Sequence, residues 1–154
     1  MLLNELFDQK YSWEWETTGR QYTAFFTTDK EITYAVDITP VAHTDLIDNE
    51  MIRKYDPVWK PDFAIEQYSG KAATKDTTGI TGSGNEFLVF STVIDILKSF
   101  IKKEKPNAIL FSAKEPSRVK LYDTFVKRNF KNKTIKTGEA DGEKYYFVIL
   151  NEVE

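Results

Sequence analysis

Gly82-Ser83-Gly84-Asn85 is the stretch that decides the fold, because it leads directly into an apolar-rich run that continues to about Lys103. Apolar residues of this run recur at helical spacing, and polar residues fill the positions between them. The spacing therefore predicts an amphipathic helix over 86–103, ended by Pro106-Asn107. Its expected buried stripe is Phe87, Phe90, Ile94, Leu97 and Ile101, and its expected solvent face is Ser91, Asp95, Lys98 and Lys102.

The run that follows this helix, Ala108 to Phe111, is entirely apolar and predicts a buried strand. A glycine-containing turn, a helix and a strand in this order are typical of a phosphate-binding βαβ unit. The first turn of a helix has unpaired backbone N–H groups, and the helix dipole favours an anion there. We therefore expect Gly82, Ser83, Gly84 and Asn85 to bind a phosphate-bearing ligand. The alternative is a loop-to-helix joint without a ligand.

Upstream, three strand-like runs predict an antiparallel meander. Residues 12–16 and 21–28 alternate in polarity, and so do residues 32–39, where Ile32, Tyr34, Val36 and Ile38 share one face. The connections between these runs are hairpin-short. Pro40 ends the meander.

Between the meander and the glycine pair, the polarity pattern predicts a helix, a loop, a strand and a second loop. Thr44 to Tyr55 predicts a helix capped by Thr44. Pro57 and Pro61 bound an expected loop that holds Trp59. Asp62 to Tyr68 alternates like a strand, and residues 69–81 predict a polar surface loop.

The C-terminal third predicts a helix and a hairpin. Pro116 suits the first turn of the helix, and Ser117 is a possible cap. The hairpin turns at Ala140-Asp141-Gly142. The runs 108–111 and 145–150 are apolar on both faces, so we predict that they are adjacent interior strands. The whole chain, 1–154, is expected to form a single α+β domain: a mixed, mostly antiparallel sheet flanked by helices.

The composition and the local motifs exclude several kinds of catalytic, metal and nucleotide-binding site. The chain has 154 residues, no cysteine and a single histidine, His43, which excludes thiol catalysis and multi-histidine metal sites, so no metal is expected. No transmembrane-length run or signal peptide is evident, which predicts an intracellular, cytoplasmic protein. A P-loop is excluded because Asn85-Glu86 follows the second glycine, and a dinucleotide fingerprint is excluded because Phe87 stands at its third glycine.

The net charge of −3 conceals a strong asymmetry. Residues 1–97 carry 8 basic and 16 acidic side chains, and residues 98–136 carry 12 and 3. A basic block inside an acidic protein indicates an acidic partner or nucleic acid, and solvation of two helices is the alternative.

The order of meander, Gly-x-Gly helix start, strand, helix and hairpin resembles the GNAT superfamily of N-acetyltransferases over about residues 62–150. Gly82-Ser83-Gly84-Asn85-Glu86-Phe87-Leu88 resembles part of that family's acetyl-CoA motif, and Leu121-Tyr122 resembles its second helix. Residues 87–93 and 115–122 also resemble small GNAT-like proteins carried by tailed bacteriophages. The chain differs from the family pattern at Glu115 and Arg118, where the family often has Asn and Ala.

The resemblance implies acetyl transfer from acetyl-CoA to an amine acceptor, with Tyr122 protonating the leaving CoA thiolate. Glu66 is the candidate general base, because a partly buried carboxylate with a raised pKa can take a proton from an ammonium. Lys71 and Lys75 are candidate contacts for the 3′-phosphate of CoA. The alternative function is a non-catalytic, GNAT-like binding protein that uses residues 98–136, and a phage accessory protein in the host cytoplasm is compatible with either function. Nothing in the sequence identifies the acceptor.

Overall fold

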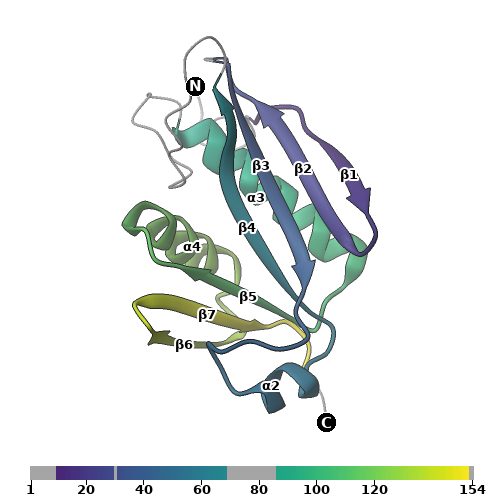
Figure 1. Ribbon diagram of the computed structural model, residues 1–154, viewed down its shortest axis with the longest axis vertical. Helices are drawn as coiled ribbons and strands as arrows, with labels where there is room; N and C mark the ends of the chain where they lie inside the picture. The colour runs from purple at the N-terminus through teal and green to yellow at the C-terminus, as the bar shows by residue number, and fades with distance from the viewer. Residues whose placement is uncertain (1–9, 30, 69–85, 153–154) are drawn as a thin grey trace.

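A computed structural model describes residues 10–29, 31–68 and 86–152 of the chain (Figure 1). Within these residues the chain forms one seven-stranded sheet and three helices. The elements, in chain order, are β1 (Glu14–Thr18), β2 (Gln21–Thr27), β3 (Ile32–Pro40), α2 (Asn49–Lys54), β4 (Val58–Tyr68), α3 (Glu86–Glu104), β5 (Ala108–Ala113), α4 (Pro116–Asn129), β6 (Thr134–Ala140) and β7 (Glu143–Ile149).

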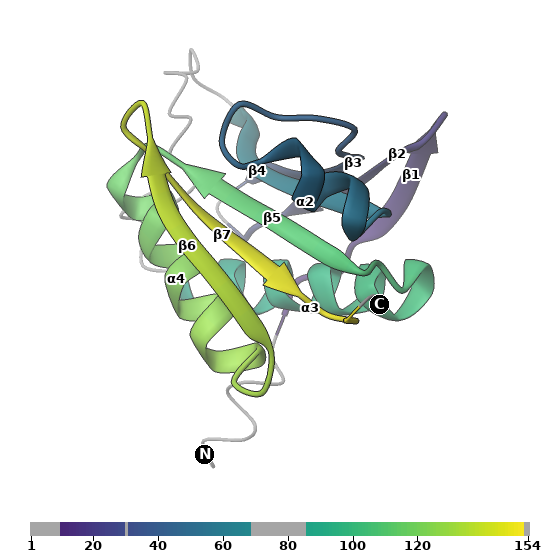
Figure 2. The ribbon, with the colours of Figure 1, turned by 90° about the horizontal axis from the view of Figure 1, so that it is seen from below.

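The strands are ordered β1-β2-β3-β4-β5-β7-β6 across the sheet. Neighbouring described strands are antiparallel except β4 and β5, which are parallel and joined through α3. Helices α3 and α4 cover one face of the sheet, and the short α2 lies on the other (Figure 2). The predicted α+β class with a mixed, mostly antiparallel sheet is therefore confirmed.

The strand predictions that rest on clear alternation are also confirmed. β1, β2 and β3 form the antiparallel meander. β5 is buried along its whole length and pairs with β7, so the two runs that are apolar on both faces are adjacent and interior. The β6–β7 hairpin turns at Asp141 and Gly142, whose φ angles of 54° and 78° are those of a primed turn.

The helix predicted over 86–103 is confirmed as α3, but its buried face differs from the prediction. The face that packs on the sheet is Val89, Val93, Ile96, Leu97 and Phe100, and Ser91 and Thr92 are buried as well. Ser91 was therefore wrongly assigned to the solvent face.

Residues 11–13 pack along α3, so part of the face expected to meet solvent is covered. Thr92 Oγ1 accepts a hydrogen bond from the Tyr11 backbone N–H at 2.8 Å and donates one to the Leu88 carbonyl at 2.7 Å. Trp13 Nε1 donates to Asp95 Oδ2 at 2.8 Å. The Thr92 and Asp95 side chains are thus hydrogen-bonded where the N-terminal residues cover them.

Two predicted helix starts are wrong. The helix expected from Thr44 is only Asn49–Lys54, and Asp48 caps it by accepting a hydrogen bond from the Glu50 N–H at 2.9 Å. Thr44 instead accepts a hydrogen bond from the Leu46 N–H within the preceding loop. Helix α4 begins at Pro116 with Glu115 as the N-cap residue, so Ser117 lies inside the helix rather than capping it.

The loop predicted between Pro57 and Pro61 is wrong as well, because β4 already begins at Val58. Trp59 and Pro61 are strand residues that pair with Pro40 and Ile38 of β3. The pairing of β4 with β5 ends at Trp59, so one side of β4 is without a partner strand where Pro61 stands. A proline is tolerated at such a position because no ladder hydrogen bond is lost there.

Two hydrophobic clusters fill the two faces of the sheet. The larger lies under α3 and α4 and includes a row of stacked rings, Phe26, Tyr34 and Phe63, whose centroids are 5.3 Å apart in each pair. Trp15, Tyr22, Trp59 and Phe100 meet edge to face at the carboxyl end of α3. The smaller cluster lies under α2 and includes Ile52, Tyr55 and Phe147. Among the described residues, no helix is long and apolar enough to cross a membrane.

Candidate functional site

The site is centred on the place where β4 and β5 part. These parallel strands pair only through Val58 with Ala108 and Trp59 with Ile109, although β4 continues to Tyr68 and β5 to Ala113. The two strands diverge toward their carboxyl ends in Figure 1. In open sheets that contain parallel strands, ligands bind outside the carboxyl ends of the strands where neighbours separate. A ligand is therefore expected where β4 and β5 separate.

Helix α4 positions Tyr122 beside this parting. Tyr122 is 1% exposed, and its ring lies 5.2 Å from that of Phe111 on β5. Its hydroxyl is buried and has no hydrogen-bond partner among the described residues. A buried hydroxyl without a partner costs about 1–3 kcal/mol, so this atom is unusual in a packed interior.

The surroundings of Tyr122 keep it protonated. Burial raises the pKa of the Tyr122 hydroxyl, and the nearby Asp62 carboxylate raises it further. Arg118 and the Phe63 backbone N–H oppose this rise in pKa. The Phe63 N–H already donates a hydrogen bond to Asp62 Oδ1 at 3.1 Å. The Tyr122 hydroxyl is therefore a neutral donor at physiological pH, facing β4 at Asp62 and Phe63.

An ion pair connects α4 to β4 next to this hydroxyl. Arg118 Nη1 lies 3.4 Å from Asp62 Oδ1 and 3.9 Å from Glu115 Oε2. The Arg118 side chain is 11% exposed, whereas that of Asp62 is 64% exposed. This ion pair therefore connects a largely buried arginine on α4 to an exposed aspartate on β4.

Asp62 and Arg118 are site residues that the sequence did not reveal. A local signal was present, since Glu115, Arg118 and Tyr122 follow the three- and four-residue spacing of one helix face. No such signal exists for Asp62, because its approach to α4 depends on how β4 and β5 diverge.

The predicted base, Glu66, lies in β4 at a β-bulge. Tyr34 pairs with Ile65 and Thr33 pairs with Gln67, so Glu66 is the residue that the register skips. Bulges are common beside active sites, where they redirect a side chain. The side chain of Glu66 lies outside the described part of the structure, and its role as a base stays a prediction.

The predicted phosphate-binding residues Gly82, Ser83, Gly84 and Asn85 also lie outside the described residues, as do Lys71 and Lys75. α3 begins at Glu86, directly after them in the sequence. The phosphate-binding role of this segment stays a prediction.

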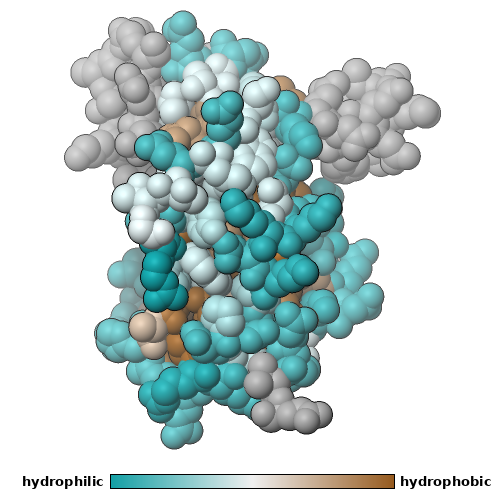
Figure 3. Space-filling view, turned by 90° about the vertical axis from the view of Figure 1, so that its right-hand side faces the viewer, coloured by the Kyte–Doolittle hydropathy of each residue, from teal (hydrophilic) through white to brown (hydrophobic). Residues whose placement is uncertain are grey.

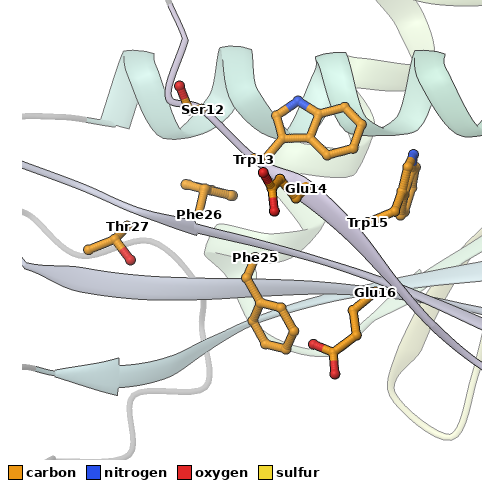
Figure 4. A pocket seen from close by; sticks show the side chains of 8 residues that line it. All are labelled: Ser12, Trp13, Glu14, Trp15, Glu16, Phe25, Phe26 and Thr27. Atoms are coloured by element: carbon orange, nitrogen blue, oxygen red, sulfur yellow. The ribbon is translucent and has the colours of Figure 1, made fainter.

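A second feature is a hollow of about 820 Å³ at the β1 edge of the sheet (Figure 4). Trp13 and Trp15 lie on its α3 side, and Glu16 and Phe25 point to the opposite side of the strands. The molecular face on this side of the protein is mostly hydrophilic or intermediate in hydropathy (Figure 3). The hollow therefore combines aromatic walls with carboxylates. Its lining residues are Ser12, Trp13, Glu14, Trp15, Glu16, Phe25, Phe26 and Thr27.

Comparison with known proteins identifies one family. The model of a family of unknown function, DUF6934, matches residues 8–138. The match covers most of the chain, and the chain therefore belongs to this family. No curated protein and no solved structure matches it.

Proposed function

We propose that this member of DUF6934 is an N-acyltransferase that moves an acetyl group from acetyl-CoA to an amine, on a GNAT-like fold. The observation that carries the proposal is the buried Tyr122 hydroxyl, which has no partner among the described residues and lies beside the parting of β4 and β5. The crossover from β4 through α3 to a parallel β5 supports the GNAT-like fold. A cytoplasmic location, in a host cell if the chain is phage-encoded, is part of the proposal.

The residues present suit an acyl-CoA thioester. Backbone groups of β4 beyond Trp59 and of β5 beyond Ile109 are not paired to each other, so they are available to an extended ligand between the strands. The backbone N–H groups of Gly82 to Asn85 would hold the pyrophosphate at the start of α3. Acetyl-CoA supplies an activated acyl group on a thiol leaving group.

In the proposed reaction, Glu66 takes a proton from the ammonium of the acceptor, directly or through water. The neutral amine then forms a bond to the thioester carbonyl carbon, and the carbon–sulfur bond breaks. Tyr122 donates its hydroxyl proton toward the departing sulfur, and the second proton that the attacking nitrogen loses as the amide forms returns through solvent to the Tyr122 oxygen. A thiol has an ordinary pKa of about 8.5, well below that of the buried Tyr122, so much of the contribution is a hydrogen bond to the developing thiolate.

The second candidate function is binding of an acidic partner or nucleic acid through residues 98–136. Lys98, Lys102 and Lys103 are exposed at the carboxyl end of α3, and Lys120 and Lys136 are exposed on α4 and β6. Figure 2 shows α4 and the carboxyl end of α3 at opposite sides of the helix layer, so the basic block is divided between two places. This division favours acetyl transfer as the leading proposal.

The test is acetyl-CoA binding, measured by calorimetry on the full chain and on Gly84→Val. A valine side chain would obstruct close approach of the backbone amides to phosphate, so we expect binding to be lost. We expect only a modest loss of stability, because a loop at a helix start contributes little to the core. Ser83→Ala is the matched control: it keeps every backbone amide and should bind like the parent. Absence of acetyl-CoA binding by the parent would refute the enzyme, and equal acetyl-CoA affinity of Gly84→Val and the parent would refute the phosphate-binding role of the glycine pair.

A further inference from the structure

A row of polar side chains crosses four strands on the face of the sheet opposite α3. Glu16 of β1 pairs with Thr23 of β2, Thr23 with Asp37 of β3, and Asp37 with Asp62 of β4. Directly paired residues of neighbouring strands point to the same face. We call Glu16, Thr23, Asp37 and Asp62 the acidic row. Strands are about 4.8 Å apart, so the row spans about 14 Å from Glu16 to Asp62.

The acidic row is open to solvent and ordered by neutral donors. Glu16 and Asp62 are exposed, and Asp37 is partly exposed. Asp37 Oδ1 accepts hydrogen bonds from Thr23 Oγ1 at 2.7 Å and from Gln21 Nε2 at 3.1 Å, which fixes its carboxylate without neutralising it. Two residues along each strand from the pair Glu16 and Thr23, Glu14 pairs with Phe25. This pair adds a carboxylate and an aromatic ring to the same face.

The charge changes along the row. Its β1 end carries Glu14 and Glu16, which also line the hollow in Figure 4. Its β4 end carries Asp62 with the Arg118 guanidinium at 3.4 Å, and Lys60 of β4 lies two residues before Asp62 on the same face. The row is therefore strongly acidic at one end and close to neutral at the other.

The near-neutral end meets the candidate reaction centre. The Tyr122 hydroxyl is buried, has no partner among the described residues, and belongs to the residue one turn of α4 after Arg118, which pairs with Asp62. This buried donor is an observation independent of the carboxylates, and it joins the acidic row to the place where the acyl group is expected.

We propose that the acidic row is the acceptor site and that its substrate class is a linear aliphatic polyamine. This inference rests on the proposed acetyl transfer. A nitrogen at the β4 end lies near Arg118, whose charge disfavours an ammonium and favours the neutral amine that attacks a thioester. The remaining ammonium groups lie on Asp37, Glu16 and Glu14, and the Phe25 ring contacts the methylene chain and a nearby cation.

A linear polyamine fits these features better than a single amine. Its methylene chain separates successive nitrogens by about one strand spacing of about 4.8 Å, so it can meet carboxylates on neighbouring strands. A monoamine can meet only one of these carboxylates at a time, so it would bind more weakly than a triamine.

The test is calorimetric titration of the full chain with the triamine bis(3-aminopropyl)amine and, separately, with propylamine, in low salt and without acetyl-CoA. We expect the triamine to bind and to lose about tenfold or more in affinity in the double variant Glu14→Gln/Glu16→Gln. Glu139→Gln/Asp141→Asn removes the same charge from the β6–β7 hairpin at the far edge of the sheet. It should bind the triamine like the parent.

Three outcomes would overturn the assignment. Glu14→Gln/Glu16→Gln could bind the triamine as tightly as the parent, or the triamine could bind no tighter than propylamine. In a third titration, a lysine-rich peptide could bind tighter than the triamine. Thermal melting of both double variants verifies that they fold. Acetyl-CoA titration of the same samples is read separately. Its failure contradicts the proposed acetyl transfer, whereas the amine titrations test the acidic row itself.

Discussion

Tyr122→Phe should change stability and activity in opposite directions. The substitution removes a hydroxyl that is buried without a partner among the described residues and leaves the ring against Phe111. Relief of an unsatisfied polar group is worth about 1–3 kcal/mol, and we take about 1 kcal/mol as the expected gain in free energy of unfolding. For a chain of this size, that gain raises Tm by about 2–4 °C. Turnover should fall by about 10²-fold if the hydroxyl is the acid or donor.

Thermal and urea unfolding give the stability change, and an acetyl-transfer assay with mixed amines gives the activity change. Tyr146→Phe is the matched control. The Tyr146 hydroxyl donates to Asp123 Oδ1 at 2.9 Å, so its removal should cost about 1 kcal/mol of stability. Tyr146 lies on β7, on the side of β5 that is turned away from β4, and its hydroxyl is bonded to Asp123, so acetyl transfer should be unaffected.

Two results would refute this reasoning. If Tyr122→Phe loses as much stability as Tyr146→Phe, the Tyr122 hydroxyl has a partner and is a structural group. If Tyr122→Phe gains stability but keeps full turnover, the hydroxyl is not part of the reaction. Acetyl-CoA binding should persist in either variant, because the ring still packs.

Other predictions follow from the same contacts. Burial raises the pKa values of Tyr122 and Tyr146, so their ionisation should leave the free energy of unfolding unchanged below pH 10 and lower it as the pH rises above 10, which melting curves between pH 8 and 11 will reveal. Gly138→Ala should lose no more than about 1 kcal/mol in urea unfolding, because its Cβ would lie 2.6–2.8 Å from the outer end of the half-buried Tyr145 ring, which can shift. If residues 98–136 bind nucleic acid, affinity should fall steeply with salt in filter binding; salt-insensitive binding would contradict that role.

The elements that the sequence predicted correctly depend on short-range periodicity. β5 and β7 are apolar on both faces, which only an interior strand position satisfies, and β7 pairs with β5 on one side and with its hairpin partner β6 on the other. The meander was readable because Tyr34, Val36 and Ile38 alternate with polar residues across a sheet with one covered face.

The elements that were missed depend on contacts between distant segments. Pro61 indicated a loop because a proline disfavours a paired strand, and only the divergence of β4 from β5 makes it compatible with one. The contact between Thr92 and the Tyr11 backbone was missed because nothing local shows that this segment lies against α3. The acidic row was hidden for the same reason, since its members come from four strands whose register is set across the sheet.

Packing alone does not account for the side chain at position 122. A phenylalanine would fill the same space against Phe111 and would avoid a desolvation cost of about 1–3 kcal/mol. The Phe63 N–H, which lies close to the hydroxyl, donates to Asp62 Oδ1, and Asp62 is itself paired with Arg118. A domain of this size has a total stability of about 8–23 kcal/mol, so such a cost is a noticeable fraction of it. A ligand entering between β4 and β5 with an acceptor atom, such as a thioester sulfur, would remove the cost, which is why the hydroxyl is better explained by chemistry than by folding.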